Sequence, residues 1–472
     1  MLFSPSPPRR RLQLRFSERR LALMIGDALA VVLAVLIALW VWSRVADYAF
    51  TLDFLLPQAS WFFLLATLWF VLASANGYYD LALATRRMAS IQRLLVITLQ
   101  LLVVYLIVFF LSDRNALPRL FILYYGVASF LLLALSRVLN PVLVGWASAP
   151  RRLLIVGTDD NARIIIQAVQ RFAYGAYTIS GLIGTEAEVG GEIEGVPIIG
   201  TARDLMNFVN RDNIRELVMT TTQHSGEMFQ AIMDAYERGV TLTPMPLLYE
   251  RITERVPIEN VGDDWMIVLP IGERPSYDIY PVLKRLIDLL VSIVGLFVLG
   301  LSLPLIALLI RLDSPGTIFY RQTRVGRNGR HFKIVKFRSM VMDAERHTGA
   351  VFAQQNDPRV TRFGRIMRKT RLDELPQFWN IFKGEMSLIG PRPERPEHVS
   401  RLQAKIPFYR TRLLVRPGVT GWAQVRYRYG ADDQDALIKL QYDLYYIRHQ
   451  SLLLDVNILL RTIGQVLRLS GQ

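Results

Sequence analysis

The residues best suited to chemistry lie in one run, RKTRLDELPQFWNIFKGEMSLIGPRPE, which extends from Arg368 to Glu394. Within this run the carboxylates of Asp373 and Glu374 stand among basic residues, just before apolar residues at helical spacing. The pattern predicts a helix with Asp373 at its N-cap and its end at Gly384. A helix N-terminus presents unpaired backbone N–H groups, so together with the neighbouring arginines it is suited to hold a phosphate or pyrophosphate. Two carboxylates that face bound phosphates need a divalent cation between them.

The composition limits the class of protein and the kinds of reactive or metal-binding site that the chain can contain. The chain of 472 residues is long enough for two or three domains together with membrane segments, and 52% of its residues are hydrophobic, which points away from a purely soluble protein. It contains no cysteine, which excludes disulfides, thiolate metal sites and cysteine nucleophiles and fits exposure to a reducing cytoplasm. Five histidines in the whole chain do not favour a histidine-rich zinc centre.

Positive charge is concentrated in the C-terminal part of the chain. The net charge is +15, and all of this excess lies from Lys284 onward, because the charges before Lys284 nearly cancel. A basic segment of this kind suggests anionic partners such as phospholipid head groups or nucleotide sugars. Nucleic acid is the competing interpretation, but no nucleic-acid module pattern is present, so we expect no nucleic-acid partner.

Four apolar stretches in the first third of the chain are each close to the roughly 20 residues that span a bilayer. Arginines lie before the first stretch, between the second and third, and after the fourth, which places both ends of the group in the cytoplasm. We therefore expect a basic cytoplasmic tail over residues 1–20 and a bundle of four transmembrane helices over residues 21–145. Asp27 is the one acid inside these stretches, and pairing within the bundle explains it better than a functional role. The stretches are Leu21 to Val45, Phe54 to Ser74, Leu94 to Leu111 and Leu120 to Leu139.

A fifth apolar stretch, from Leu286 to Ile310, raises a question of sidedness. If it crossed the membrane completely, the Asp-Glu run would lie outside the cell, whereas nucleotide sugars and Mg²⁺-nucleotides are cytoplasmic. Ser302 and Pro304 lie within it, and proline removes a backbone donor and bends a helix. Basic residues flank both ends, so we interpret residues 284–311 as a re-entrant helix with its bend at Ser302 and Pro304. A kinked spanning helix is the alternative that hydropathy leaves open.

The middle of the chain changes to a soluble pattern of alternating strands and helices. Short apolar runs alternate with helical stretches from Arg151 onward, which predicts a Rossmann-like α/β domain over residues 150–245, followed by a linker over residues 246–279. The first turn, Gly157 to Asn161, lacks the later glycines of a dinucleotide fingerprint and carries two acids where a pyrophosphate would lie. We interpret these acids as helix caps and the domain as a spacer or assembly module, with a regulatory ligand pocket as the alternative.

Further strings accompany the Asp-Glu run after the fifth apolar stretch. They are KFRSM, which contains Lys336, NDPRVTRFGRIMRKTRLDELPQ, the GPRP turn at Gly390 to Pro393, and RPGVTGWAQVRYRYG from Arg416. Together these strings closely resemble the bacterial sugar transferases, the monotopic polyprenyl-phosphate hexose-1-phosphate transferases. The resemblance covers Tyr280 to the C-terminus, and the preceding helices and Rossmann-like domain are similar to the extension of the large members. The tail strings GWAQVRYRYGA and QYDLYYIRHQSLLLD resemble the branch associated with exopolysaccharide systems.

The resemblance implies an activity as well as a fold. It implies a mainly helical monotopic catalytic domain over residues 280–472, within a membrane protein of the α plus α/β class. Its reaction would transfer a hexose-1-phosphate from a UDP-sugar to undecaprenyl phosphate, through a covalent aspartyl-phosphosugar intermediate, with release of UMP. The product would be the first lipid-linked sugar of an exopolysaccharide or another surface glycan. A carboxylate is able to attack the phosphorus that bears the sugar, and Mg²⁺ and basic residues would offset the growing charge.

Family roles extend to single residues. Asp373 would be the nucleophile and Glu374 a metal-binding or orienting group, so that both carboxylates are candidate Mg²⁺ ligands. Without the surrounding strings, the same two residues would be explained as an N-cap and a first-turn acid. The residues that match phosphate-binding positions of the family are Lys336, Arg368, Arg392 and Arg428.

The implied partners are a UDP-sugar, undecaprenyl phosphate and the phospholipid bilayer. A homodimer and downstream glycosyltransferases are further expectations, and residues 452–467 have the pattern of an interfacial amphipathic helix, although a partner-docking helix fits it equally well. The implied location is the inner (cytoplasmic) membrane, with the catalytic domain facing the cytoplasm. Two other functions stay open at this point: a non-enzymatic scaffold or sensor of a polysaccharide export system, and a glycosyltransferase that releases UDP. The residues do not identify the sugar.

Overall fold

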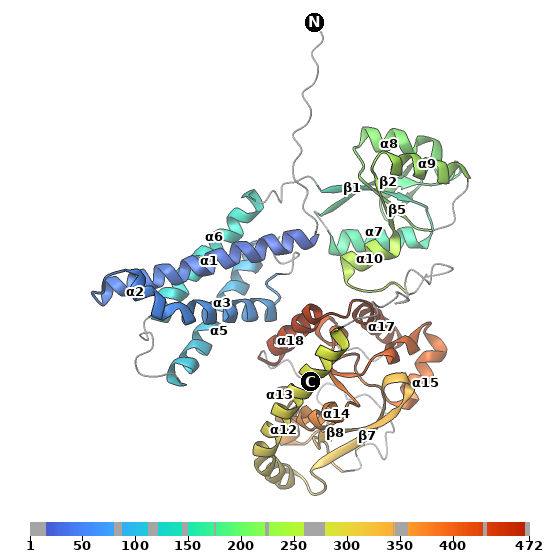
Figure 1. Ribbon diagram of the computed structural model, residues 1–472. Helices are drawn as coiled ribbons and strands as arrows, with labels where there is room; N and C mark the ends of the chain where they lie inside the picture. Colours follow the sequence, from blue (N-terminus) through green and yellow to red (C-terminus); the bar gives the residue numbers. More distant parts are fainter. Residues whose placement is uncertain are drawn as a thin grey trace. The chain divides into compact units, whose positions relative to one another are not determined.

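The computed structural model describes residues 16–79, 87–111, 121–143, 150–173, 176–221, 226–258, 279–342, 344, 357–427 and 432–467 (Figure 1). The chain divides into two compact units, Met1–Thr243 and Pro244–Gln472. The first unit contains a group of long apolar helices and an α/β domain. The second contains the run around Asp373.

Long apolar helices form the first part of unit one. Helices α1, α3, α5 and α6 pack against one another around a shared core that includes Trp69, Leu94 and Tyr125. By length and composition α1, α5 and α6 are each able to cross a membrane. The second predicted stretch, Phe54 to Ser74, is not one straight helix, because α2 and the 3-10 turn η1 meet α3 at an angle of 49°. Pro57 lies in η1 and has no backbone N–H with which to continue a helix. The bounds are α1 Phe16–Val45, α2 Leu52–Leu55, η1 Leu56–Gln58, α3 Ala59–Ala75, α5 Arg87–Leu111 and α6 Phe121–Leu143.

Asp27 of α1 pairs with Arg137 of α6 inside this group of helices. The Arg137 Nη2 to Asp27 Oδ2 distance is 2.9 Å, and both side chains are buried. The guanidinium group also lies 4.0 Å from the centre of the Tyr78 ring. The predicted pairing of Asp27 is therefore confirmed, and each buried charge is compensated by the other.

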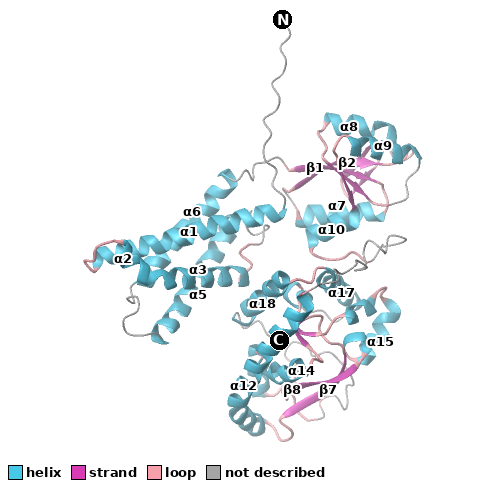
Figure 2. Ribbon diagram, viewed as in Figure 1, coloured by secondary structure: helices cyan, strands magenta, loops and turns pink. Residues whose placement is uncertain are grey.

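The α/β domain is built on a six-stranded mixed sheet with the order β3-β4-β2-β1-β5-β6. Strand β1 pairs in parallel with β2 and β5. Helix α7 covers one face of the sheet and α8 and α9 cover the other, so the C-terminal part of β1 is fully buried (Figure 2). This parallel centre agrees with the predicted Rossmann-like class. The bounds are β1 Arg151–Val156, α7 Asp160–Phe172, β2 Tyr177–Ile183, β3 Glu192–Ile193, β4 Val196–Gly200, η2 Ala202–Asp204, α8 Leu205–Arg211, β5 Glu216–Met219, α9 Gly226–Glu237 and β6 Thr241–Pro244.

Acidic side chains occupy the loops at the C-terminal ends of β1 and β2. Asp159 caps α7, as predicted, by accepting a hydrogen bond from the backbone N–H of Ala162 at 3.3 Å. Glu188 accepts a hydrogen bond from the Thr158 hydroxyl at 2.8 Å. The other oxygen of Glu188 accepts from the backbone N–H and the hydroxyl of Thr185, at 2.8 and 2.7 Å. Carboxylates thus lie where a Rossmann domain would bind the pyrophosphate of a dinucleotide.

The second unit begins earlier in the chain than the sequence pattern indicated. Residues 246–279 were expected to form a linker, but α10, Met245–Thr253, is a helix of this unit. The residues that follow α10 enter the same core as α17, where Val256 and Ile258 are buried. A linker pattern and a short amphipathic helix differ little in sequence, which explains the corrected boundary. Residues 259–278 lie outside the described part of the chain.

The rest of the second unit consists of the 34-residue helix α12, shorter helices and two two-stranded sheets, β7 with β8 and β9 with β10. The bounds are α12 Tyr280–Asp313, β7 Phe319–Val325, η4 Arg327–Gly329, β8 His331–Phe337, α13 Arg362–Thr370, η5 Leu372–Gln377, α14 Phe378–Lys383, β9 Ser387–Ile389, α15 Pro396–Lys405, η6 Tyr409–Leu414, β10 Gly418–Thr420, α16 Trp422–Arg426, α17 Asp433–Arg448 and α18 Leu452–Leu467. Strands β7 and β8 are antiparallel, whereas β9 and β10 are parallel.

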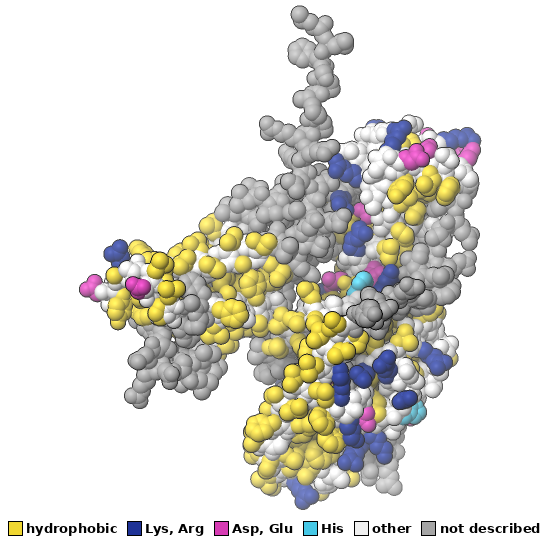
Figure 3. All heavy atoms as spheres, in the orientation of Figure 1, with side chains coloured by type: hydrophobic (Ala, Val, Ile, Leu, Met, Phe, Trp, Pro, Cys, Tyr) yellow, Lys and Arg dark blue, Asp and Glu magenta, His cyan; other side chains and the backbone are white. Residues whose placement is uncertain are grey.

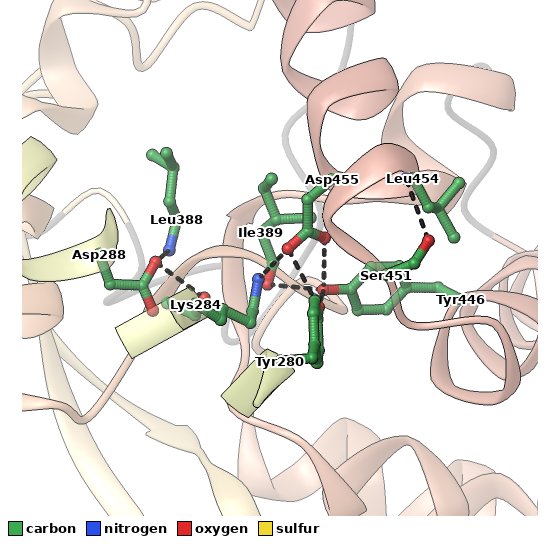
Figure 4. A network of polar contacts seen from close by, with 10 residues as sticks. Tyr280, Lys284, Asp288, Leu388, Ile389, Tyr446, Ser451, Leu454 and Asp455 are labelled. Carbon is green, nitrogen blue, oxygen red and sulfur yellow. Dashed lines mark hydrogen bonds and ion pairs between the residues drawn. The ribbon is translucent and has the colours of Figure 1, made fainter. Parts of the chain in front are cut away.

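Polar contacts attach the first turns of α12 to the rest of this unit (Figure 4). Asp455 of α18 accepts hydrogen bonds from Lys284 at 2.9 Å, from the Tyr280 hydroxyl at 3.0 Å and from the Tyr446 hydroxyl at 3.0 Å. One turn further along α12, Asp288 accepts from a backbone N–H of β9 at 2.9 Å. The start of α12 is therefore held by α17, α18 and β9 together.

Candidate active site

The Asp-Glu pair lies in a 3-10 helix rather than at an α-helix N-cap. Helix α13 ends at Thr370, and Arg371 adopts the left-handed conformation with φ of 59°. A new helical turn starts directly afterwards, so Arg371 is the N-cap and Asp373 lies inside η5. The predicted N-cap at Asp373 is wrong, because the left-handed residue turns the chain two positions earlier. The predicted end at Gly384 is confirmed, with a φ of 82° that glycine adopts without strain.

Glu374 is held by two of the predicted phosphate-binding residues. Its Oε1 lies 2.7 Å from Lys336 Nζ on β8 and 3.5 Å from Arg392 Nη2. Burial raises the pKa of Glu374, but the charges of Lys336 and Arg392 and the hydrogen bond from Lys336 outweigh it and lower the pKa to about 2. Glu374 is therefore ionised at neutral pH.

Asp373 has a different environment from its neighbour. Its side chain is buried, yet within the described part of the chain no group donates a hydrogen bond to its carboxylate. Burial, and next the negative charge of Glu374, raise the pKa of Asp373 to about 6, against the attraction of Lys336, Arg368 and Arg392. An ionised carboxylate that is poorly solvated and not hydrogen-bonded is a stronger nucleophile than an ordinary aspartate.

Arg368 completes the basic surroundings of Asp373. It lies in the last turn of α13, and its Nε donates to the Ser339 hydroxyl at 3.0 Å. Thr361 caps α13, because its hydroxyl accepts from the backbone N–H of Gly364 at 3.0 Å. The backbone N–H of Thr361 donates to the carbonyl oxygen of Ser339 at 3.1 Å, which attaches the helix to the preceding segment. Three predicted phosphate-binding residues, Lys336, Arg368 and Arg392, are thus gathered around the carboxylate pair from three separate strings. The fourth, Arg428, lies outside the described residues.

The GPRP turn is fixed by strands on one side and a buried arginine on the other. Gly390 donates its backbone N–H to Thr420 O at 2.9 Å, which continues the pairing of β9 with β10. A Cβ atom on Gly390 would lie 2.3 Å from the carbonyl oxygen of Arg416, so only glycine fits. Arg412 is buried, and it donates to the carbonyl oxygen of Arg392 at 3.1 Å and to Asp443 at 2.9 Å. The main chain of Arg392 is therefore held rigidly.

Sequence reasoning missed the residue that places the DELPQ segment against Lys336. Asn380 of α14 is buried, and its side chain bridges two backbone groups of β8: it accepts from Val335 N at 3.1 Å and donates to Lys333 O at 2.8 Å. These bonds fix α14 beside β8, one residue from Lys336. The sequence did contain a signal for this role: Asn380 lies within an apolar helical pattern, and a buried amide needs hydrogen-bond partners.

Comparison with known proteins decides the family. The family model described as bacterial sugar transferase matches residues 279–469. An exopolysaccharide production protein from Rhizobium leguminosarum bv. phaseoli is 41% identical over 191 residues, which are 39% of this chain and 94% of that protein. The chain belongs to the bacterial sugar transferase family. A second family model, described as a CoA-binding domain, matches residues 74–240.

Two relatives that are longer than the Rhizobium protein carry names that describe a reaction. A UDP-N-acetylgalactosamine-undecaprenyl-phosphate N-acetylgalactosaminephosphotransferase from Aeromonas hydrophila is 45% identical over 218 residues, 46% of this chain and 50% of that protein. A UDP-glucose:undecaprenyl-phosphate glucose-1-phosphate transferase from Xanthomonas campestris pv. campestris is 32% identical over 325 residues, 67% of this chain and 66% of that protein. The matches thus span half of the first relative and just under two thirds of the second.

Proposed function

We propose that this protein transfers a sugar-1-phosphate from a UDP-sugar to undecaprenyl phosphate and releases UMP. The observation that carries the proposal is the buried Asp373 carboxylate, free of hydrogen bonds among the described residues and placed between Lys336, Arg368 and Arg392. The names of the Aeromonas and Xanthomonas relatives give the same reaction class. The exopolysaccharide name of the Rhizobium relative supports a role in starting such a glycan.

The reaction has two displacements at phosphorus. In the first, an oxygen of Asp373 attacks the phosphorus that bears the sugar, a P–O bond of the pyrophosphate breaks, and UMP leaves with the bonding electrons. In the second, a phosphate oxygen of undecaprenyl phosphate attacks the same phosphorus and Asp373 is regenerated as a carboxylate. Lys336, Arg368 and Arg392 stabilise the charge that develops on the phosphoryl oxygens, while Glu374 keeps Lys336 and Arg392 in place.

The carboxylate pair is suited to a Mg²⁺ ion. No cluster of three or more acidic or histidine side chains able to bind a metal occurs among the described residues. Mg²⁺ does not need such a cluster, because it commonly binds through one or two carboxylates plus substrate phosphates. The free carboxylate of Asp373 and the ionised Glu374 fit this pattern. When bound, the ion would neutralise the pyrophosphate and the departing UMP.

We further propose that α12 enters and leaves the membrane on the same side. Its start is bound to Asp455, and at its other end Asp313 accepts a hydrogen bond from Phe363 N at 2.8 Å, also in the second unit. Between these ends Ile306 and Ile310 pack in a core with Met367. A spanning helix would carry its ends to opposite sides of the bilayer, whereas one folded unit contacts α12 along its length. With the N-terminal helices oriented by their arginines, we propose that the catalytic unit lies on the cytoplasmic face of the inner membrane.

The outer face of α12 suits contact with lipid. Phe297, Leu301 and Leu305 are 68%, 70% and 63% exposed, and Figure 3 shows apolar side chains gathered over this helix. Ser302 donates its hydroxyl to Val298 O at 2.8 Å just before Pro304, whose missing N–H interrupts the helix ladder. These two residues are where we place the bend. Helix α12 is continuous through both residues, so the bend at Ser302 and Pro304 stays a prediction.

We interpret the α/β domain as an assembly or spacer module of the transferase. Hydrogen bonds from Thr185 and Thr158 hold Glu188 and lower its pKa. A negative charge therefore persists at neutral pH at the C-terminal ends of β1 and β2. An anionic nucleotide would have to displace this carboxylate. A homodimer and downstream glycosyltransferases are the partners that such a module would serve.

The test uses membranes that contain the full-length protein, supplied with UDP-hexoses, undecaprenyl phosphate and Mg²⁺. UMP release that depends on the lipid acceptor after the first turnover, and that Asp373→Asn abolishes, is the expected result. Release of UDP would instead identify a glycosyltransferase that moves the sugar without its phosphate. Turnover that persists unchanged in Asp373→Asn would remove Asp373 from its role. A panel of UDP-sugars in the same assay identifies the sugar.

A further inference from the structure

The catalytic unit includes a segment that precedes the region matched by the family. The match begins at residue 279, but residues 245–258 are part of the second compact unit. Glu250 of α10 lies 3.0 Å from Arg448 and 2.7 Å from His449, at the end of α17. Just beyond α10, the backbone N–H of Val256 donates to an oxygen of α17 at 3.1 Å. These contacts attach the segment firmly to α17.

Glu254, the residue after α10, binds both ends of the short helix α16. Its carbonyl oxygen accepts a hydrogen bond from the Trp422 indole N–H at 3.2 Å. Its carboxylate forms an ion pair with Arg426 at 2.7 Å, and the side chains of Glu254 and Arg426 are only 17% and 22% exposed. Trp422 and Arg426 are the first and last residues of α16, so one residue fixes the whole helix.

Between these two contacts α16 presents Gln424 to the active site. The side-chain oxygen of Gln424 lies 3.4 Å from Arg392 Nη1, and Arg392 Nη2 lies 3.5 Å from Glu374. The side-chain nitrogen of Gln424 is buried and has no protein partner among the described residues. A buried donor without a partner is costly, so this amide is suited to bind an oxygen of the bound substrate.

We propose that Glu254 is a positioning residue for the sugar-phosphate transfer. It holds α16 so that Gln424 keeps the Arg392 guanidinium beside Glu374. This inference rests on the proposed function, because it assigns Arg392 to stabilising the transferring phosphoryl group. A displacement of about 1 Å at such a group is enough to cost up to about 100-fold in rate, so a residue outside the matched region is able to control the reaction.

The discriminating variant is Glu254→Gly. Glu254 has a φ of 56°, a conformation that glycine adopts without steric cost, so this change removes the carboxylate without penalising the backbone. We expect unchanged thermal stability and a rate of UMP release that is roughly 10-fold lower, within the range that misplacement of a catalytic group produces. Asp433→Ala is the matched control, because it removes an ion pair with Lys405 at 2.6 Å elsewhere on the same unit, and we expect it to keep the wild-type rate.

Two readouts separate positioning from loss of structure. With UDP-sugar and no lipid acceptor, the amplitude of the UMP burst counts competent sites and its rate reports the chemical step. Glu254→Gly should keep the amplitude and slow the burst, whereas a merely structural role would reduce the amplitude. In a Gln424→Ala background, Glu254→Gly should have little further effect, since both changes act through the same contact.

Independent, multiplicative effects of the two substitutions would overturn the proposal, as would a burst rate equal to that of wild type in Glu254→Gly. Failure of the proposed function itself would look different. In that case the wild-type protein would release no UMP at all, so there would be no rate of UMP release for Glu254→Gly to lower.

Discussion

Replacing Glu374 with glutamine removes the negative charge that lies closest to Asp373 while it keeps the shape of the side chain. Burial, and next the charge of Glu374, raise the pKa of Asp373 from 3.8 to about 6. In Glu374→Gln the contribution of burial remains and that of the neighbouring charge disappears. Lys336 also loses its partner at 2.7 Å, so its charge acts more strongly on Asp373. Both changes favour the ionised form of Asp373.

The size of the effect follows from the order of these causes. Burial is the larger cause, so removing Glu374 should lower the pKa of Asp373 by about one unit, equivalent to about 1.4 kcal/mol. Nucleophilic attack needs the carboxylate, so activity is present above the pKa of Asp373 and is lost as the pH falls through it. The acid limb of the pH–rate profile should therefore move to lower pH in the variant, even though its maximal rate falls with the loss of a candidate Mg²⁺ ligand.

The assay is the burst rate of UMP release from UDP-sugar without lipid acceptor, measured across the acid limb at one fixed Mg²⁺ concentration. Each profile is scaled to its own maximum, so that the midpoint is read independently of the rate. Asp433→Asn is the control, because this carboxylate lies in an exposed ion pair with Lys405, and its midpoint should equal that of wild type. A midpoint in Glu374→Gln at or above the wild-type value would refute the assignment of Asp373 as the titrating nucleophile raised by its neighbour.

Three further variants test other parts of the site. Asp373→Asn should raise the melting temperature at neutral pH. Folding raises the pKa of Asp373, so the wild-type side chain costs stability as the pH rises through about 6. The gain in the variant should vanish below pH 3.8, where the wild-type residue is neutral in both the folded and the unfolded state. Lys336→Met should lower the free energy of unfolding, measured by denaturant titration, by about 2 kcal/mol, since it leaves Glu374 buried with one cation fewer. The double variant Lys336→Met with Glu374→Gln should recover most of that loss in the same titration. Gly390→Ala should abolish UMP release, because its Cβ would meet a carbonyl oxygen at 2.3 Å, whereas Gly300→Ala, whose Cβ meets nothing within 4 Å, should keep activity and serves as the matched control.

Much of the architecture could be predicted because it depends on local pattern. Long apolar runs indicate membrane-sized helices wherever they occur, and alternating short strands and helices indicate a layered sheet. The capping role of Asp159 followed from its type and its position before an apolar helical pattern. The pairing of Asp27 followed from the cost of an isolated charge among apolar helices, although its partner, Arg137, lies far away in the sequence.

The active site could be assembled from sequence only through resemblance to a family. Lys336, Arg368 and Arg392 come from three strings, and nothing local indicates that they surround one carboxylate. The left-handed Arg371, which moves the helix start ahead of Asp373, was not apparent either, because arginine carries no preference for that conformation. The left-handed turn lies between α13 and η5, which pack against each other.

Contacts between distant segments account for the remaining differences. Helix α10 was assigned to a linker because its partners, Arg448 and His449, follow it by almost two hundred residues. Gln424 received no role because the RPGVTGWAQVRYRYG string was used only for Arg428, whereas the structure places the glutamine against Arg392. In both places a polar side chain gains its function from a neighbour that no periodicity reveals.

In the proposed mechanism Asp373 becomes covalently attached to the phosphosugar, so the decisive experiment is to trap that adduct. Purified protein is mixed with UDP-sugar and Mg²⁺ without undecaprenyl phosphate, quenched in acid, digested and examined by mass spectrometry. We expect one hexose-phosphate on the peptide that contains Asp373, one equivalent of UMP, and loss of the adduct when undecaprenyl phosphate is added before the quench. UMP release without any adduct, or an adduct on another residue, would contradict it.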